Sequence, residues 1–263
     1  MIIDSHLHFG NVVRFNLTEE MLLSSMKKYS INFGLVSNIE AIEYDFDRKP
    51  VFIINQYGAN LKTVQLCKKH PDTLKGLFWI KPVTETLDEK SKELILENKD
   101  IFVGFKAHPY HSQLKVTDSR YIPYFEFASI HNLPFAVHTC IDSWSDCRFL
   151  HEVALQYPQV KFIAVHMDLR SDYKKAVEYI KNTPNLYGDT TWVNDGKTVE
   201  WILQECGMNK IIFGSDAPID GVDTYASYRE MIEYLKKSLT PAQWNMVFAN
   251  NAKNIFRMLQ NKA

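Results

Sequence analysis

The sequence lacks an excess of charge of either sign, since 30 basic residues are set against 31 acidic ones and the net charge is −1 at pH 7. A chain that binds nucleic acid or an anionic membrane through long-range attraction carries a clear positive excess. The sequence also lacks any apolar run near the roughly 20 residues needed to span a bilayer. These absences argue against nucleic acid and membrane as partners, and leave a small molecule as the expected ligand.

Cysteine is scarce as well. The four cysteines, Cys67, Cys140, Cys147 and Cys206, form no CxxC pair and no spacing typical of a disulfide framework. The N-terminus has no basic, apolar and small-residue order of a secretory leader, because an apolar run begins at Ile2. Free thiols in a reducing compartment are the simpler interpretation, and we expect a cytoplasmic protein.

Short β-branched or apolar runs alternate with longer amphipathic runs along the whole chain. The 46% apolar content is enough to bury the core of one large α/β domain spanning residues 1–263. We expect strands over residues 2–8, 32–37, 74–80, 101–106, 134–138, 161–166, 185–190 and 210–215. We expect helices over residues 19–29, 60–70, 88–98, 121–131, 146–157, 172–181, 199–206 and 225–237. A further C-terminal helix is expected after Thr240, with Pro241 at its first position and Gln243 placed for a capping box.

Eight strands, each followed by a helix, predict an α/β fold that is a single (β/α)8 TIM barrel with an extra C-terminal helix. A doubly wound open sheet has the same alternation and is the alternative. No linker or low-complexity stretch indicates a second domain. Residues 40–55, rich in charge and aromatics, are expected to form a long loop or lid after the second strand.

His6 and His8 are the most informative residues of the chain. Side chains two apart on a strand point to the same face, so these two imidazoles, together with Asp4, are expected to share one face. Imidazole is the commonest protein ligand for zinc and related metals. The pair therefore indicates a metal site at the end of the first strand.

Later strands also end in polar residues, several of them two positions after a small one. The pairs are Gly104 with Lys106, Ala136 with His138, Ala164 with His166, Gly188 with Thr190, and Gly214 with Asp216. Parallel strands buried on both faces usually carry large aliphatic residues, so small residues beneath polar ones indicate a hollow at the carboxyl ends. A closed barrel makes the first and last strands neighbours, which lets these groups surround one point. This favours the barrel over the open sheet.

An ordered set of motifs resembles the amidohydrolase superfamily, specifically the branch related to aminocarboxymuconate-semialdehyde decarboxylase. The motifs are Asp4-Ser5-His6-Leu7-His8, Gly104-Phe105-Lys106-Ala107-His108-Pro109, Val137-His138-Thr139, Val165-His166, Leu186-Tyr187-Gly188-Asp189-Thr190-Thr191, Phe213-Gly214-Ser215-Asp216-Ala217-Pro218, and Asn251-Ala252 before Ile255-Phe256. They follow the family's order and cover essentially the whole chain.

The resemblance implies a mononuclear metal site. His6, His8, His138 and Asp216 would bind one divalent ion, with Zn²⁺ expected, although manganese, iron and cobalt suit the same ligands. The metal would lower the pKa of its bound water to about 7. His166 would orient that water or exchange protons with substrate, and Asp216 would pass the water's proton to the leaving group.

Lys106 and His108 have open roles. By resemblance, a carbamylated Lys106 would bridge to a second metal held with His138 and His166. Alternatively, Lys106 binds a substrate carboxylate or pairs with Asp4 or Asp216, since an unpaired buried lysine is costly. We favour one metal. His108 is a candidate for substrate contact, whereas His111 is expected to be an exposed loop histidine.

Several other polar residues fall in loops on the same face. Arg14, Arg48 and Arg170 are candidates to clamp a substrate carboxylate. The tryptophans Trp144 and Trp192 fall in the same loops. Asp142 and Asp168 also follow strands, with no role decided by the sequence.

The leading functional prediction is a metal-dependent hydrolase that attacks a C–N or C–O bond of a cyclic amide, ester or lactone with a metal-activated water. The alternative is a metal-dependent, non-oxidative decarboxylase of a small unsaturated or aromatic carboxylic acid, which needs the same ligands. A third interpretation is a non-catalytic ligand-binding barrel. Barrels of this kind often dimerise, so a homodimer is possible as well.

Overall fold

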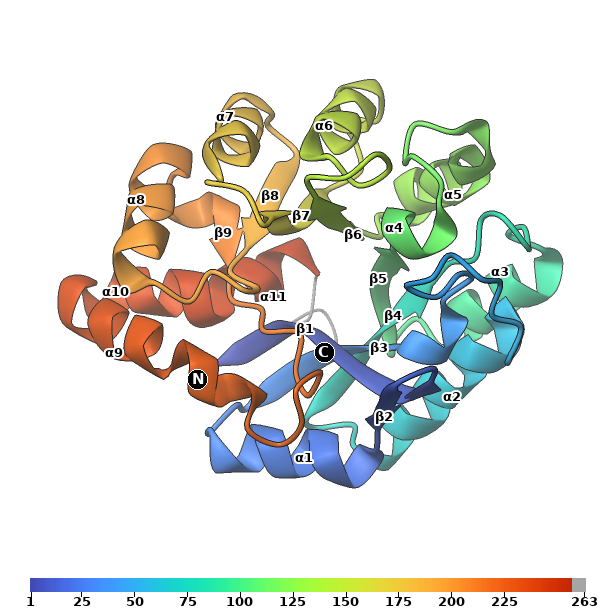
Figure 1. The fold of residues 1–263 in the computed structure, drawn as a ribbon, viewed down its shortest axis with the longest axis horizontal. Helices are drawn as coiled ribbons and strands as arrows, with labels where there is room; N and C mark the ends of the chain where they lie inside the picture. The colour runs from blue at the N-terminus through green and yellow to red at the C-terminus, as the bar shows by residue number, and fades with distance from the viewer. Residues whose placement is uncertain (257–263) are drawn as a thin grey trace.

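A computed structural model describes residues 1–256 of the chain, and its centre is a ring of parallel strands (Figure 1). The strands of the ring are β1 (Ile3–Val12), β3 (Phe33–Asn38), β4 (Leu74–Trp79), β5 (Phe102–Ala107), β6 (Phe135–Cys140), β7 (Phe162–Leu169), β8 (Leu186–Asp189) and β9 (Ile211–Ile212). Each pairs in parallel with the next one in the chain. This order is the expected alternation of a TIM barrel.

Backbone hydrogen bonds close the ring between β1 and the segment that follows β9. The amide of Ser5 donates to the carbonyl of Phe213 at 3.0 Å, and the amide of Asp216 donates to the carbonyl of His6 at 2.9 Å. The amide of His8 donates to the carbonyl of Ala217 at 3.0 Å. The barrel prediction is therefore confirmed and the open sheet is wrong.

Helices follow the strands and surround the ring (Figure 1), with the short α4 at the carboxyl ends of the strands. They are α1 (Glu19–Lys28), α2 (Gln56–Lys69), α3 (Glu89–Glu97), α4 (Pro109–Ser112), α5 (Ile122–His131), α6 (Cys147–Gln156), α7 (Lys174–Asn182), α8 (Gly196–Cys206) and α9 (Arg229–Ser238). The first one shows why they form where they do. Thr18 caps α1 by accepting from the amide of Met21 at 3.1 Å, while Glu19 and Glu20 in the first turn complement the helix dipole.

The C-terminal segment closes the amino end of the barrel. The expected capping box of Thr240 and Gln243 starts α10 (Pro241–Asn245), which continues through a π-helical turn (Met246–Asn250) into α11 (Asn251–Ile255). Ala249, Ala252, Ile255 and Phe256 pack in one cluster with inward residues of the strands, such as Ile163. This leaves the carboxyl ends of the strands as the open end.

Two features at the start of the chain differ from the sequence expectation. The strand β1 continues past His8 and pairs with a short antiparallel strand, β2 (Phe15–Leu17), in a hairpin that the pattern did not predict. A bulge shifts the register of β1 between Asp4 and Leu7. The Asp4 carboxylate therefore bonds to the hydroxyls of Ser215 and Tyr225, and does not share a face with His6 and His8.

The long loop expected over residues 40–55 is present as an excursion without regular helix beyond the 3₁₀ turn Ile39–Ala41. It is fastened to α4 by two contacts with one residue. The amide of Tyr44 donates to the carbonyl of His111 at 2.8 Å, and His111 Nδ1 lies 2.7 Å from the carbonyl oxygen of Tyr44. Within residues 1–256, no helix has both the length and the apolar character that crossing a membrane would require.

Candidate metal and proton-transfer site

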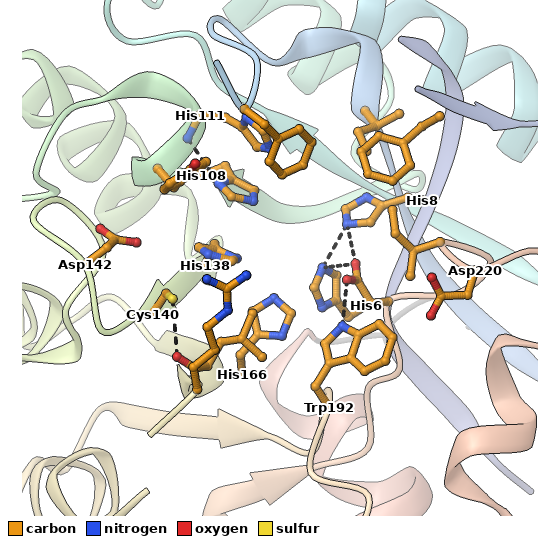
Figure 2. A pocket seen from close by; sticks show the side chains of 18 of the residues that line it. His6, His8, His108, His111, His138, Cys140, Asp142, His166, Trp192 and Asp220 are labelled. Atoms are coloured by element: carbon orange, nitrogen blue, oxygen red, sulfur yellow. Dashed lines mark hydrogen bonds and ion pairs between the residues drawn. The ribbon is translucent and has the colours of Figure 1, made fainter. Parts of the chain in front are cut away.

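A cavity of about 320 Å³ opens at the carboxyl ends of the strands (Figure 2). Its floor is polar and includes His6, His8, His138, His166 and Asp216. Figure 2 shows His6 and His8 on one side, with His138 and His108 facing them across the cavity. The structure therefore brings the sequence-predicted groups into one hollow, at the end of the barrel where such sites occur.

Three of the four predicted metal ligands form a tight cluster. His6 Nε2 and His8 Nε2 lie 2.9 Å apart, and Asp216 Oδ1 lies 3.4 Å from the first and 3.0 Å from the second. The indole nitrogen of Trp192 donates to Asp216 Oδ2 at 3.0 Å, which leaves Oδ1 for the histidines. Two nitrogens and one carboxylate oxygen thus converge on a single point.

The protonation states of this cluster suit a cation. Burial, and then the charge of Lys106, keeps the pKa of His6 well below its usual value, so its imidazole is neutral. Burial alone would raise the pKa of Asp216, but the hydrogen bond and charge of His8 bring it down to about 2. Two imidazole nitrogens and an ionised carboxylate oxygen are the ligand types that divalent cations take in proteins, and a bound cation would replace the proton that His8 shares with Asp216. The residues therefore fit a metal ion.

His138, the fourth predicted ligand, lines the same cavity from β6 but lies outside the tight cluster. Its ring centroid is 4.7 Å from that of His166, which in turn is 5.3 Å from that of His6. The Nδ1 atoms of His138 and His166 are both buried without a hydrogen-bond partner. Such orphaned atoms are uncommon in a folded protein, and they mark both rings as available to a ligand.

His138 also belongs to a second group of potential ligands, with Cys140 and Asp142, whose ligand atoms lie within 4.8 Å of one another. The thiol of Cys140 donates to the carbonyl of Leu169 at 3.2 Å. Burial raises the pKa of that thiol to about 11, so it is protonated at neutral pH. All four cysteines of the chain are free and buried, as expected for reduced thiols.

Lys106 is completely buried and points at the cluster, with its Nζ 2.8 Å from His6 Nε2. Burial lowers its pKa to about 8, against the opposing effect of the charges of Asp216 and Asp189. The proposed pairing with Asp4 is not found, because that carboxylate is engaged elsewhere. The position of Lys106 agrees with contact to a substrate or metal, and its role as a ligand stays a prediction.

The two loop histidines after β5 differ from each other. His108 lies on the cavity wall, stacked on His138 with ring centroids 3.8 Å apart and on Trp79 at 5.9 Å. His111 was expected to be exposed, but only 5% of it is accessible. That expectation is wrong because its ring is enclosed where it holds the Tyr44 loop. Burial lowers its pKa to about 4 and keeps it neutral.

The cavity walls are aromatic, and arginines are present among them. Phe15, Phe46, Trp79, Tyr110 and Trp192 all contribute to the walls. Arg14, at the tip of the β1–β2 hairpin, lies over the ring of Phe46 at 4.0 Å, and Arg170 lines the cavity as well. By contrast, Arg48 is stacked on Trp144 at 5.0 Å, and neither of these two residues lines the cavity.

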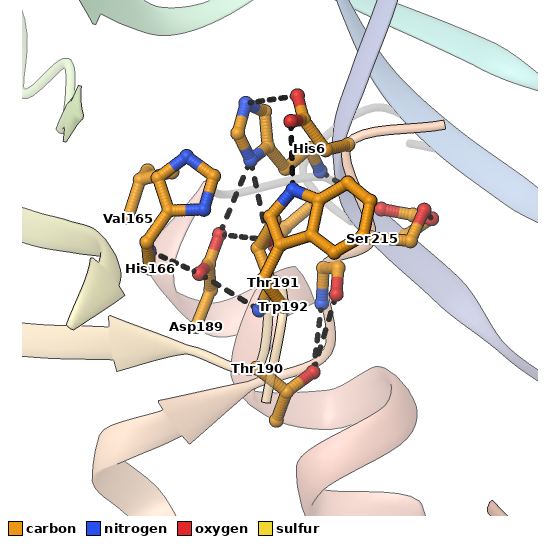
Figure 3. A network of polar contacts seen from close by, with 12 residues as sticks. His6, Val165, His166, Asp189, Thr190, Thr191, Trp192 and Ser215 are labelled. Atoms are coloured by element: carbon orange, nitrogen blue, oxygen red, sulfur yellow. Dashed lines mark hydrogen bonds and ion pairs between the residues drawn. The ribbon is translucent and has the colours of Figure 1, made fainter. Parts of the chain in front are cut away.

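Sequence reasoning missed Asp189 and Thr191, which lie directly beneath the histidines (Figure 3). It placed Gly188 and Thr190 on the inner face, yet a Cβ at Gly188 would meet Met167 of β7 and Ile180 of α7, which pack in the cluster between strands and helices. Asp189 therefore points inward, with Oδ2 3.6 Å from His6 Nδ1. Burial raises its pKa to about 6, opposed by hydrogen bonds from His166 and Thr191. The signal available in the sequence was Gly214, whose missing side chain makes room for this pair.

Comparison with known proteins gives one family match. The amidohydrolase family model matches residues 3–258. No curated protein shows significant similarity to the chain.

Among solved structures, a 2,6-dihydroxybenzoate decarboxylase from Rhizobium is similar, with 18% identity over 98% of both chains and a TM-score of 0.69. A 5-carboxyvanillate decarboxylase from Novosphingobium aromaticivorans, complexed with manganese and a nitrobenzoic acid, has 12% identity over 98% of this chain and 96% of that one, with a TM-score of 0.72. A probable 2-pyrone-4,6-dicarboxylic acid hydrolase from Acinetobacter baumannii has 16% identity over 97% and 99%, with a TM-score of 0.67. At these identities the likeness shows a shared fold.

Proposed function

The chain belongs to the amidohydrolase family, and on that premise we propose that it is a metal-dependent decarboxylase. Its substrate would be a small aromatic or unsaturated carboxylic acid that loses carbon dioxide without oxidation. The observation that carries the proposal is the cavity, which combines aromatic walls, two arginines and a metal-binding cluster at its floor. This reverses the order of the two sequence predictions, in which hydrolysis came first.

The size of the cavity limits the substrate. Ligand cavities span roughly 300–1,000 Å³, and the value of about 320 Å³ lies at the small end. A single ring with its substituents fits this volume. Planar side chains such as Trp79 and Trp192 give an aromatic or conjugated acid extensive contact.

Charge also favours an acid. Arg14 and Arg170 line the cavity, and Lys106 is buried behind the lining residue His6, with its Nζ 2.8 Å from His6 Nε2. Acidic groups on the wall are Asp142, Asp216 and Asp220, of which Asp216 belongs to the cluster. Guanidinium groups pair with carboxylates through two parallel hydrogen bonds, so the arginines are suited to the substrate's acid group.

His6, His8 and Asp216 would hold the metal, with His138 placed across the cavity to join them. When bound, the ion would supply positive charge to an oxygen of the substrate and withdraw electrons from the reacting ring. Relatives of this fold include a decarboxylase complexed with manganese. Zinc therefore remains a prediction from the ligand types, and manganese is an equal candidate here.

We assign delivery of the proton to His166. Decarboxylation breaks the bond between the ring carbon and the carboxylate, and the electron pair left on the carbon takes up a proton as carbon dioxide leaves. His166 Nδ1 faces no protein partner. Burial lowers the pKa of this imidazole to about 3, and the negative charge of a bound carboxylate would oppose that effect and favour the protonated form. The reaction consumes one proton, so His166 must regain its proton from solvent before the next turnover, while Asp216 stays ionised beside His6 and His8.

Hydrolysis of a cyclic ester is the second candidate, favoured by the fold shared with the probable pyrone dicarboxylic acid hydrolase. The same His166 would then orient an attacking water. Both functions use the same cluster and the same arginines, so only the product distinguishes them.

The test is a product assay on the purified, metal-loaded protein. Hydroxylated benzoates and unsaturated dicarboxylic acids are screened for release of carbon dioxide, and pyrones and lactones for ring opening. His166→Asn is expected to lower turnover by about 10²–10⁴-fold, the usual value of a positioned acid or base. His131→Asn is the matched control, since His131 is an exposed histidine on α5.

Carbon dioxide release that is lost only in the His166 variant would support the proposal. Ring opening without carbon dioxide release would replace it with the hydrolase. No turnover of either panel by protein with bound metal would favour the non-catalytic barrel.

A further inference from the structure

Asp189 and Thr191, at the end of β8, contact both the metal-ligand candidate His6 and the proton-transfer candidate His166. Figure 3 shows the Asp189 carboxylate between the two histidines. Asp189 is only 1% exposed. Neither Asp189 nor Thr191 has a role in the proposed reaction itself. What the two residues do can be derived from the direction of each hydrogen bond.

Thr191 determines which nitrogen of His6 carries a proton. Its hydroxyl donates to Asp189 Oδ2 at 2.8 Å, because an ionised carboxylate can only accept. The hydroxyl's single proton is then used, so the oxygen can only accept from His6 Nδ1, which lies 3.2 Å away. His6 Nδ1 must therefore carry the proton.

Lys106 leads to the same tautomer from the other side of the ring. An ammonium group has donors and no acceptor, and Lys106 Nζ lies 2.8 Å from His6 Nε2. His6 Nε2 therefore presents a lone pair, and this is the atom that faces His8 and Asp216. Both neighbours fix the form of His6 that can bind a metal through Nε2.

The second oxygen of the same carboxylate holds the His166 backbone. Asp189 Oδ1 accepts from the amide of His166 at 2.9 Å and from the amide of Thr191 at 3.1 Å. His166 has φ = 72°, a left-handed conformation that is costly for a side chain other than glycine. The bond from Asp189 helps to retain it and so directs the His166 ring into the cavity.

We infer that Asp189 and Thr191 are positioning residues, which set the His6 tautomer for metal binding and fix His166 at the correct place beside it. The inference rests on the metal-dependent part of the proposed function, and not on which acid is the substrate. Outer partners of this kind change metal affinity by about 10–100-fold when they are removed.

The first test measures metal affinity by competition with a chelator, using Mn²⁺ and Zn²⁺ on the purified protein. Thr191→Val keeps the shape of the side chain but loses the hydroxyl, and we expect affinity to fall by about 10–100-fold. Thr191→Ser restores the hydroxyl and should restore affinity. Thr190→Val is the matched control, because the Thr190 hydroxyl bonds to the carbonyl of Gly214 and has no contact with His6.

The second test reads the tautomer directly from ¹⁵N chemical shifts of the imidazole rings in metal-free protein, with the His6 signals assigned by their loss in His6→Gln. The wild type is expected to carry the proton on Nδ1. In Asp189→Asn the amide oxygen is expected to stay on the backbone amides of His166 and Thr191, which turns the NH₂ group toward the Thr191 hydroxyl. The hydroxyl then accepts from this NH₂ group and is free to donate to His6 Nδ1, so the tautomer should shift toward Nε2–H.

Unchanged affinity in Thr191→Val, or a wild-type His6 protonated on Nε2, would overturn the inference. Neither measurement uses a substrate. A protein that loses metal affinity in Thr191→Val but decarboxylates nothing would therefore uphold this inference and refute the proposed reaction.

Discussion

Replacing Asp168 by Asn is expected to make the protein more stable above pH 7. Asp168 is a buried carboxyl at the end of β7 that accepts from the amide of Cys147 at 2.8 Å, at the start of α6. Burial raises its pKa from 3.8 to about 7, and the nearby charges of Asp146 and Asp142 act in the same direction. An amide oxygen can accept the same hydrogen bond, and Asn tolerates the local φ of 64° at least as well as Asp.

The direction of this pH effect follows from the number of protons that the folded and unfolded states bind. An unfolded chain releases this proton near pH 3.8 and the folded chain near pH 7, so the folded state binds more protons between these values. The free energy of unfolding of the wild type therefore falls as the pH rises from about 4 to 7. A shift of about three units at 1.36 kcal/mol each sets an upper limit of about 4 kcal/mol. The Asn variant has no ionisable group at this position, so its free energy of unfolding does not include this loss.

The assay is urea unfolding of both proteins at pH 5 and pH 8, in the same chelator. Burial also raises the pKa values of Asp4 and Asp189, but both proteins carry these two residues. The difference in pH dependence between wild type and variant therefore reports on Asp168 alone. The pKa of Asp168 lies about two units above pH 5, so we expect the variant to gain up to about 2.7 kcal/mol more at pH 8 than at pH 5. Equal pH dependence in the two proteins would mean that the Asp168 carboxyl is ionised in the fold, and would refute the reasoning.

Three further predictions concern the site. Gly214→Ala places a Cβ 2.7 Å from Thr191 Oγ1 and 2.8 Å from Asp189 Oδ2, so overpacking should lower the free energy of unfolding by about 1–3 kcal/mol. The measurement is the urea midpoint, and an unchanged midpoint would show that Asp189 and Thr191 move aside without strain. Metal-free protein should melt at a lower temperature than protein with excess Mn²⁺ or Zn²⁺, because an ion that binds only the folded state at 100 times its Kd adds about 2.7 kcal/mol. Mass spectrometry should count one ion per chain, lost in His6→Ala, whereas two ions would favour a carbamylated Lys106.

The sequence was informative where regular geometry determines the outcome. The alternation of apolar runs predicted the strands of the barrel, and the spacing of His6 and His8 correctly placed their imidazoles together. The capping residues Thr240 and Gln243 located the start of α10. In each case a local rule of strand or helix geometry operates without interference from distant parts of the chain.

Predictions failed where the backbone leaves that regular geometry. The bulge in β1 turned Asp4 away from the histidines, and nothing in the pattern marks a bulge there. His166 and Asp216 do line the cavity as predicted, but their positive φ values of 72° and 68° mean that the alternation of a regular strand does not explain where they point. His111 was misplaced for another reason, because its burial depends on the Tyr44 loop, which is 67 positions away in sequence.

The closure of the ring has a consequence for biosynthesis. The segment that closes the barrel against β1 also carries Asp216. One edge of β1 therefore has no hydrogen-bond partner until residues 213–217 have been synthesised. A nascent chain emerges N-terminus first. His6 and His8 therefore leave the ribosome long before their carboxylate partner exists. Binding of the proposed metal is accordingly expected only after residues 213–217 have been synthesised and have paired with β1.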